Sequence, residues 1–452
     1  MQRQEGIHFY INIVNFNSII IDEEMKTRKI THAIHALDTF FTSIEKYGKQ
    51  LFPQSFEVEK ITGSRLHLYV VDDIEPAFLV VKTIAAYAYR LARYLNKDIS
   101  KYELLLDFDI QVGAAFGDFY DFEFKTENFS ETTTIGFAAN YAAKVQALTG
   151  TAYIGISEEI YNTLPYGEKK GYERVENKLI KKYGKSCFYR KLLLNLDSPV
   201  EIKSDDLQVA KDYANSKNLS DISYSGVRKS LDFTTINRTQ CKTINGIPVF
   251  ADIRGFTSQF DKDDGNLEEM AKRTQKVLES MYRISTDCGG VHIQFQGDRE
   301  LSLYHDIPGG SIDGLFQPEK KCFKSAVLAA MRIVDAVKPF HLHVGVGEDY
   351  GRLFATKIGA RGERDNILLG ETVIQADLLE DKKAAEDQIA ITETVYSGLR
   401  SEDRNLANQF KRGAGCYIAT IGYKQYIQNI AFEQQKRNTK QNKYNGGWGD
   451  LL

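Results

Sequence analysis

The sequence predicts an α+β protein made of two tandem ferredoxin-like domains that pair with each other inside one chain. A length of 452 residues exceeds one ordinary domain and suits two or three. The same landmarks recur in the same order in both halves, which indicates an internal repeat. Within each half, strand-like and helix-like stretches follow the order βαββαβ, which is typical of a ferredoxin-like unit.

The repeat rests on short motifs at matching places. Gly63-Ser64-Arg65 corresponds to Gly297-Asp298-Arg299, and Gly136 corresponds to Gly370. The other matching pairs are Val112-Gly113 with Val346-Gly347, Phe116-Gly117 with Tyr350-Gly351, Ile156-Ser157-Glu158 with Ile391-Thr392-Glu393, and the loop from Lys182 to Phe188 with the loop from Lys411 to Tyr417. So many matches in one order are hard to attribute to chance.

The second half shows the local signals most clearly. A short apolar run at 247–253 is typical of a buried strand, and helical spacing of apolar residues follows it. Cys288-Gly289-Gly290 predicts a turn, after which two strands form a hairpin around Gly297-Asp298. The expected elements are a strand at 247–253, a helix at 267–287, strands at 291–295 and 300–304, a helix at 324–337, a strand at 341–346 and a helix from residue 372.

Composition divides the chain and sets broad limits. We expect a first domain at 1–200, a polar linker at 201–245, a second domain at 246–425 and a polar tail at 426–452, which is either mobile or a docking segment. A net charge of -3 offers no general attraction to nucleic acid or to an anionic membrane. We therefore expect neither as a partner.

The cysteines and the apolar runs indicate a cytoplasmic protein. The 5 cysteines are widely spaced and form no CxxC pair, so they are read as free thiols. The N-terminus lacks the apolar core of a signal peptide. Lys82, Arg90 and Arg93 interrupt the most apolar stretch, at 77–95, which is better explained as an amphipathic helix than as a membrane span.

One segment carries the strongest chemical signal. The run Phe-Ala-Asp-Ile-Arg-Gly-Phe-Thr-Ser at 250–258 closely resembles the opening motif of class III adenylate and guanylate cyclases. The resemblance continues with Gly297-Asp298 in the expected hairpin and covers both halves, leaving out the linker and the tail. It implies that Asp252 and Asp298 hold two divalent metal ions, Mg²⁺ or Mn²⁺. Two aspartates that only cap turns are the plainer alternative.

The chemistry of cyclisation explains such a pair of carboxylates. The 3′-hydroxyl of a nucleotide must attack its own α-phosphate and expel pyrophosphate, and divalent ions activate the hydroxyl and neutralise the triphosphate. The resemblance also implies that the carbonyl of Ile253 contributes to the metal site. The residues implied to grip phosphates through the following turn are Gly255, Phe256 and Thr257.

The first half lacks the metal carboxylates, because Asn12 and Ser64 stand where the second half has its aspartates. Neutral side chains hold divalent ions poorly. The helix after Gly136 instead carries Asn140 and, one turn later, Lys144. The resemblance implies that Asn140 orients the ribose and that Lys144 stabilises charge on the α-phosphate, although the family has arginine at the second place.

The two halves are therefore deficient in opposite ways. The second half has Ile374 and Leu378 at the positions of Asn140 and Lys144, and neither can do their work. This pattern resembles the pseudo-heterodimer of two-domain cyclases. It implies that Arg361 and Lys182 contact the triphosphate, with plain surface charges as the alternative, and that a monomer contains the whole site.

Two positions of the first half are implied to read the base, namely Lys60 and Thr133. Lysine donates to a ring nitrogen or carbonyl, and threonine either donates or accepts. The pair suits adenine and is compatible with uracil or cytosine. Guanine is the least expected base, because the glutamate of guanylate cyclases is absent from the first position.

We expect an enzyme that converts a nucleoside triphosphate into a 3′,5′-cyclic nucleotide and pyrophosphate. The plain two-domain architecture resembles the pyrimidine cyclases of bacterial antiviral defence, which make cyclic UMP or cyclic CMP for a separate effector protein. An adenylate cyclase and a catalytically silent nucleotide-binding module are the alternatives. A polymerase-like palm would need a basic groove, which the charge balance does not supply.

Overall fold

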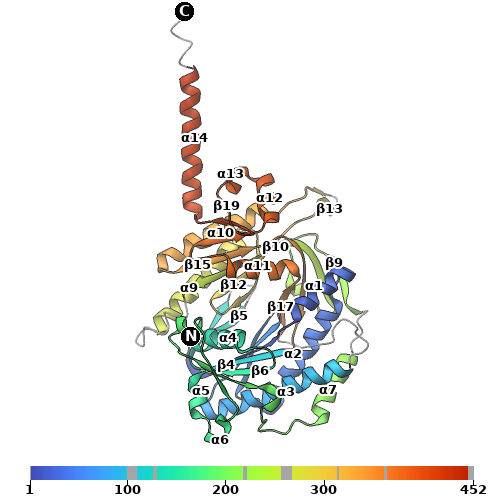
Figure 1. Cartoon of the computed structure of the whole chain (residues 1–452). Coiled ribbons are helices and arrows are strands. Elements are labelled where there is room, and N and C mark those ends of the chain that lie inside the picture. Colours follow the sequence, from blue (N-terminus) through green and yellow to red (C-terminus); the bar gives the residue numbers. More distant parts are fainter. Residues whose placement is uncertain are drawn as a thin grey trace, which may run out of the picture.

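The computed structural model describes residues 2–98, 109–125, 130–216, 221–255, 267–312, 315–360 and 364–445. Two β-sheets, one from each half of the chain, form two domains that lie one above the other in Figure 1. Strands β5 and β17 lie between the domains. The predicted α+β architecture of two tandem domains is confirmed.

The first domain has an eight-stranded sheet with the order β2-β3-β1-β4-β6-β8-β7, and β5 pairs with β4. Helices pack on both of its faces. Its strands are β1 (Gln2–Ile13), β2 (Phe56–Thr62), β3 (Arg65–Val70), β4 (Ile110–Lys125), β5 (Ser130–Gly136), β6 (Tyr153–Ile156), β7 (Glu173–Val175) and β8 (Phe188–Leu192). Its helices are α1 (Phe16–Thr27), α2 (Thr31–Leu51), α3 (Ile74–Asp98), α4 (Phe137–Thr149), α5 (Glu158–Thr163), α6 (Tyr166–Lys169) and the 3-10 turns η1 (Ile180–Tyr183) and η2 (Leu193–Asn195).

The second domain repeats this order in a ten-stranded sheet, β11-β12-β10-β15-β18-β20-β19, in which β9 (Ser223–Gly226) and β16 also pair with β10, and β17 pairs with β16. Its strands are β10 (Gln240–Arg254), β11 (Val291–Gln296), β12 (Arg299–His305), β15 (His343–Glu348), β16 (Gly351–Ile358), β17 (Asp365–Leu369), β18 (Gln388–Ile391), β19 (Lys411–Arg412) and β20 (Tyr417–Ala419), with a separate hairpin of β13 (Gly310–Ile312) and β14 (Leu315–Gln317). Its helices are α9 (Leu267–Asp287), α10 (Phe323–Val337), η5 (Lys338–Phe340), α11 (Glu371–Lys382), α12 (Glu393–Glu402) and α13 (Arg404–Ala407).

Strand register defines which residues of the two domains are equivalent. Asn12 of β1 pairs with Arg65 of β3, and Asp252 of β10 pairs with Arg299 of β12. The backbone bond from Ile13 to Ser64 has its counterpart in the bond from Ile253 to Asp298. Asn12 and Ser64 therefore occupy the places of the two aspartates.

Each core forms where alternating strand residues meet the apolar faces of helices. In β1, Ile7, Phe9 and Ile11 are fully buried in the cluster that includes α2 and α3. In α10, the buried positions from Phe323 to Val337 recur with helical spacing and cover the second sheet. These sheets fix the strand ends that carry the candidate site.

Each domain contributes a hairpin to the core of the other domain. The hairpin of the first domain is β4–β5, and that of the second domain is β16–β17. Phe122 and Phe124 of β4 belong to the core of the second domain, where the Phe124 ring lies 4.6 Å from that of Tyr282. In return, Phe354 and Ile358 of β16 belong to the core of the first domain. Neither core is complete without residues from the other half of the chain.

Residues expected to form the linker contain regular structure. Helix α7 (Ser204–Asn215) packs on α2 and α3, and β9 (Ser223–Gly226) pairs in parallel with the start of β10. The 3-10 turn η4 (Phe233–Thr235) follows, and β10 itself begins at Gln240. Leu231, Phe233 and Ile236 pack on the second sheet.

The C-terminal segment forms helix α14 (Tyr423–Asn445), which packs on α10 at its start and then projects away from the body (Figure 1). All of the expected polar tail that the structure describes, residues 426–445, belongs to this helix. No helix in the described parts of the chain has the length and apolar character needed to cross a bilayer.

Candidate active site between the two domains

The two predicted metal ligands lie side by side at the end of neighbouring strands. Asp252 is near the end of β10, and Asp298 is in the turn that joins β11 to β12. The Ile253 N–H donates to the backbone oxygen of Asp298 at 3.4 Å. Gly297 takes a left-handed φ of 69°, which glycine adopts without strain and which closes this turn.

The electrostatics of the pair favour a bound cation. Burial raises the pKa of Asp252 to about 7, and the charge of Asp298 adds to the shift. Burial likewise raises the pKa of Asp298 to about 7. Two half-buried carboxylates with raised pKa values gain from a divalent ion between them, and oxygen ligands are those that Mg²⁺ and Mn²⁺ prefer. Asp252 and Asp298 thus fit the predicted metal site.

The first domain reaches this pair through α4. Asn140 Nδ2 donates to Asp298 Oδ1 at 3.3 Å across the domain interface. A Cβ at Gly297 would lie 3.2 Å from Asn140 Oδ1, so glycine also admits this side chain. Lys144 is half-buried one turn further along the same helix. The structure therefore brings Asn140 to the predicted metal ligands, as the split-site hypothesis requires.

The predicted phosphate contacts are described only in part. Gly255 follows β10 with a φ of 67°, and Lys182 lies in η1. The adjacent Tyr183 places η1 beside the acidic pair, because burial and then the charges of Asp298 and Asp252 raise the pKa of Tyr183 to about 12. Phe256, Thr257 and Arg361 lie outside the described residues.

Three charged residues around Asp252 were not predicted. Arg254 Nη1 donates to Asp252 Oδ2 at 3.0 Å, and Arg299 forms an ion pair with Glu380 of α11 at 3.3 Å. Burial raises the pKa of Glu380 to about 7, with Arg299 opposing the shift. Both arginines directly follow a motif residue in the sequence, so adjacency alone could have drawn attention to them.

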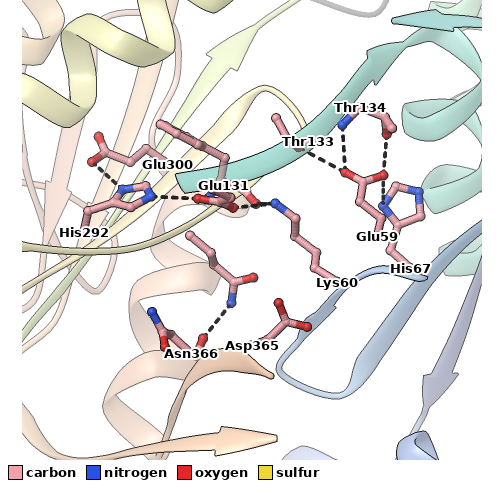
Figure 2. A network of polar contacts seen from close by, with 12 residues as sticks. Glu59, Lys60, His67, Glu131, Thr133, Thr134, His292, Glu300, Asp365 and Asn366 are labelled. Carbon is pink, nitrogen blue, oxygen red and sulfur yellow. Dashed lines mark hydrogen bonds and ion pairs between the residues drawn. The ribbon is translucent and has the colours of Figure 1, made fainter. Parts of the chain in front are cut away.

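The predicted base contact Lys60 is buried at the domain interface, with only 2% of its surface exposed. Figure 2 shows its ammonium group between the two domains. Lys60 Nζ donates to Glu131 Oε1 at 2.6 Å within the first domain and to the Phe295 carbonyl of the second domain. In this conformation Lys60 binds protein groups on both sides.

Thr133 is fully buried and its hydroxyl donates to Glu59 Oε1 at 3.0 Å (Figure 2). Glu59 also accepts from the N–H of Thr134 at 3.1 Å and from its hydroxyl. Burial opposes ionisation of Glu59, but His67 and then Lys60 outweigh it and hold the pKa of Glu59 below its usual range. An ionised Glu59 therefore fixes the direction of the Thr133 hydroxyl.

Among the described residues, His8, Glu59 and His67 form the one group of three or more side chains whose metal-ligating atoms all lie close together. His8 Nδ1 and His67 Nε2 share a hydrogen bond of 2.9 Å, and His67 Nδ1 lies 2.9 Å from Glu59 Oε2. The two nitrogens of His67 thus face different partners. The three side chains form a chain of hydrogen bonds from His8 through His67 to Glu59. A cation bound here would have to replace a proton that two of them share.

A pair of carboxylates joins the domains at their centre. Glu131 Oε1 of β5 accepts from the Phe295 N–H at 2.9 Å, and Glu131 Oε2 lies 3.0 Å from His292 Nε2. In the opposite direction, Asp365 Oδ2 of β17 accepts from the Ile61 N–H at 2.6 Å. Neither carboxylate was predicted, because nothing local in the sequence shows which strands meet across the interface.

The equivalent second site lacks the same chemistry. Ser64 Oγ donates to Asn12 Oδ1 at 2.8 Å, so these neutral side chains satisfy each other. Ile374 and Leu378 of α11 stand at the positions of Asn140 and Lys144. Only one of the two interdomain sites has the carboxylate pair.

The chain resembles solved structures of class III cyclases. A class III adenylyl cyclase-like ATP-binding protein from Pseudomonas aeruginosa matches 95% of this chain and 90% of its own length, with 15% identity and a TM-score of 0.67. The adenylyl cyclase CyaB from the same organism covers 39% of the chain with 20% identity and a TM-score of 0.32, and the guanylyl cyclase Cya2 covers 40% with 19% identity and a TM-score of 0.31.

The first of these matches spans both domains and shows the fold. The chain therefore has the tandem class III cyclase fold, with its two ferredoxin-like domains paired in one polypeptide. No family model and no curated protein matches the sequence. At this identity the likeness defines the fold and leaves the activity to be argued from the site.

Proposed function

We propose that this chain is a nucleotide cyclase with one active site, which converts a nucleoside triphosphate into a 3′,5′-cyclic nucleotide and pyrophosphate. The observation that carries the proposal is the bond from Asn140 of the first domain to Asp298 of the second. It joins the two half-sites at the metal ligands. The equivalent position of the other site has no such pair, so the chain uses a single centre.

Asp252 and Asp298, with the carbonyl of Ile253, would hold two ions of Mg²⁺ or Mn²⁺. When bound, these ions activate the 3′-hydroxyl and neutralise the triphosphate. Asn140 orients the ribose. The Lys144 ammonium group stabilises the negative charge that develops on the α-phosphate. Lys182, Arg361 and the turn at 255–257 are the proposed contacts of the remaining phosphates.

The finer proposal concerns the base. The single proton of the Thr133 hydroxyl is committed to Glu59, so this oxygen can only accept from a base. An acceptor matches the exocyclic amino group of cytosine or adenine and opposes the carbonyl that uracil and guanine carry there. Among the pyrimidine products this favours cyclic CMP over cyclic UMP. Both Lys60 and Thr133 are buried, so a base contacts them only if these side chains become exposed.

We place this reaction in cytoplasmic antiviral signalling, in which a separate effector protein reads the cyclic nucleotide. Adenine is the alternative base, because it has the same donor and acceptor edge as cytosine. The decisive experiment incubates the full chain with ATP, CTP, GTP and UTP in Mn²⁺ or Mg²⁺ and identifies the products by mass. Cyclic nucleotide from none of the four would overturn the proposal.

A catalytically silent nucleotide-binding module is the second candidate. Lys144 favours it, because an ammonium group lacks the bidentate fork of the arginine that the family has at this place. The solved structure that spans both domains is likewise described as an ATP-binding, cyclase-like protein. Binding of a triphosphate, measured by calorimetry, without any cyclic product would support this candidate over the enzyme.

A further inference from the structure

Arg254 is fixed between the metal aspartate and the end of helix α11. Its Nη1 donates to Asp252 Oδ2 at 3.0 Å. Its Nη2 donates to the carbonyls of Glu380 at 2.6 Å and Ala384 at 2.8 Å, and pairs with the Glu380 carboxylate at 2.6 Å. Only 18% of the Arg254 side chain is exposed. The protein therefore holds this guanidinium from two sides.

The space for this guanidinium is built into the sheet. Gly345 of β15 pairs with Asp252 of β10, and a Cβ at Gly345 would lie 2.0 Å from Arg254 Nη2. A residue with a side chain at position 345 would displace the arginine. The placement of Arg254 is thus a property of the backbone around Asp252 as well as of its ion pairs.

The internal repeat shows that this arrangement accompanies the aspartates. The strand register places Val14 and Gln111 of the first domain at the positions of Arg254 and Gly345. Gln146 of α4 stands at the position of Glu380 of α11, because each lies ten residues after the equivalent glycine, Gly136 or Gly370. The first domain therefore lacks the arginine, its glycine and its glutamate, just as it lacks both aspartates. A purely structural ion pair would have no reason to follow the metal ligands in this way.

We propose that Arg254 is a positioning residue that holds Asp252 Oδ2 until a divalent cation replaces it, and that Glu380 draws the guanidinium away from Asp252. The inference rests on the proposed function. A guanidinium and a divalent ion compete for the same carboxylate, so Arg254 lowers the affinity of the nucleotide-free site for metal. Glu380 lies on the other side of Arg254 and reduces that competition.

The test measures Mn²⁺ binding to the full chain by electron paramagnetic resonance, without nucleotide. Arg254→Met should tighten Mn²⁺ binding by about tenfold or more, because it removes a competing charge. Glu380→Gln should weaken binding several-fold, because Arg254 then pairs only with Asp252 among the carboxylates. Arg254→Lys, which keeps the charge, should stay close to wild type. Arg332→Met, which lies away from the site beside Cys288, is the matched control.

The outcomes separate this inference from the proposed function. Loss of Mn²⁺ binding in Asp298→Asn would locate the measured ion at the predicted site. Binding that is unchanged or weaker in Arg254→Met would overturn the inference alone, as would Glu380→Gln moving in the same direction as Arg254→Met. Failure of both wild type and Arg254→Met to bind Mn²⁺ would overturn the inference together with the metal chemistry of the proposed function.

Discussion

Glu131 and Asp365 occupy equivalent strand positions in the two domains, and each accepts a backbone N–H of the other domain. The distances are 2.9 Å from the Phe295 nitrogen to Glu131 and 2.6 Å from the Ile61 nitrogen to Asp365. Their surroundings shift the two pKa values in opposite directions. Burial raises the pKa of Glu131, but Lys60 and His292 outweigh it and hold the value low. Burial raises the pKa of Asp365 to about 7.

Glu131→Gln and Asp365→Asn should therefore differ in stability. The first variant leaves Lys60 buried without its carboxylate, which should lower the free energy of unfolding by about 3–5 kcal/mol. The second keeps an oxygen that accepts the Ile61 N–H, so it should cost no more than about 1 kcal/mol. Urea unfolding at pH 7 gives both values. The double variant Glu131→Gln with Lys60→Met should recover part of the loss, and equal costs for the two single variants would contradict this account.

Asp252→Asn and Asp298→Asn should abolish cyclisation while leaving the protein folded. Loss of a metal carboxylate removes several kcal/mol of transition-state stabilisation, which corresponds to a rate lower by about a thousandfold or more. Because the folded protein raises the pKa of each half-buried carboxyl to about 7, ionisation at pH 8 costs stability, and the amides should raise the free energy of unfolding there by about 1 kcal/mol. Product mass spectrometry and thermal unfolding test the two effects. Substantial cyclic product from either variant would refute the metal assignment.

Glu348 should make stability depend on pH. Its side chain is fully buried, neither oxygen meets a hydrogen-bond partner within the described residues, and burial raises its pKa to about 8. The unfolded chain releases this proton near pH 4.5, whereas the folded chain keeps it until about pH 8. The contribution of Glu348 to stability is thus complete below about pH 4.5 and is lost as pH rises toward 8, by up to about 1.4 kcal/mol per pH unit.

Glu348→Gln replaces the titrating carboxyl group with an amide that does not titrate, so the stability of this variant is compared with that of wild type. The difference in unfolding free energy between the variant and wild type should move in favour of the variant as pH rises from 5 to 8 and then level off. Urea unfolding at a series of pH values measures it. A constant difference over this range would show that Glu348 does not titrate as the structure indicates.

The exchanged hairpin predicts that a residue of the first half stabilises the second domain. Phe124→Ala should cost about 3–5 kcal/mol, because its buried ring packs against Tyr282 and Phe295 of the other domain. Phe316→Ala is the matched control, since that ring is 80% exposed. Hydrogen exchange should show weaker protection in α9 of the Phe124 variant. Protection lost only within residues 2–200 would contradict the exchange.

Local sequence patterns are enough to predict the fold and part of the candidate site. The motif around Asp252, the hairpin at Asp298 and the helix with Asn140 each show in a few neighbouring residues, and the structure places these three side chains together. The contacts of Lys60 could not be predicted in this way. They depend on β2, β5 and β11 meeting between domains, and Lys60 and Phe295 are 235 positions apart in the sequence. The partners of a buried charge depend on which distant strands pack together, and a local sequence pattern does not show this.

The role of Arg254 illustrates the same limit within a recognised motif. Its position next to Ile253 is plain in the sequence, but its partner Glu380 lies 126 positions further along the chain. The repeat offered an indirect signal, because Val14 and Gln146 replace the two residues in the first half. The matched glycines Gly136 and Gly370 already align Gln146 with Glu380, but only the structure shows that Glu380 contacts Arg254.

The hairpin exchange also constrains how the chain can fold as it is synthesised. A ribosome completes the first 200 residues long before it adds Phe354, Ile358, Ile367 and Leu369, which belong to the first core. Until then the first core lacks these four side chains. Phe122 and Phe124 of β4 likewise lack the second domain, against which they pack in the folded chain. Domain-by-domain folding during translation, common in large proteins, therefore cannot finish here. The core of the nascent first half therefore stays incomplete until β16 and β17 have been synthesised.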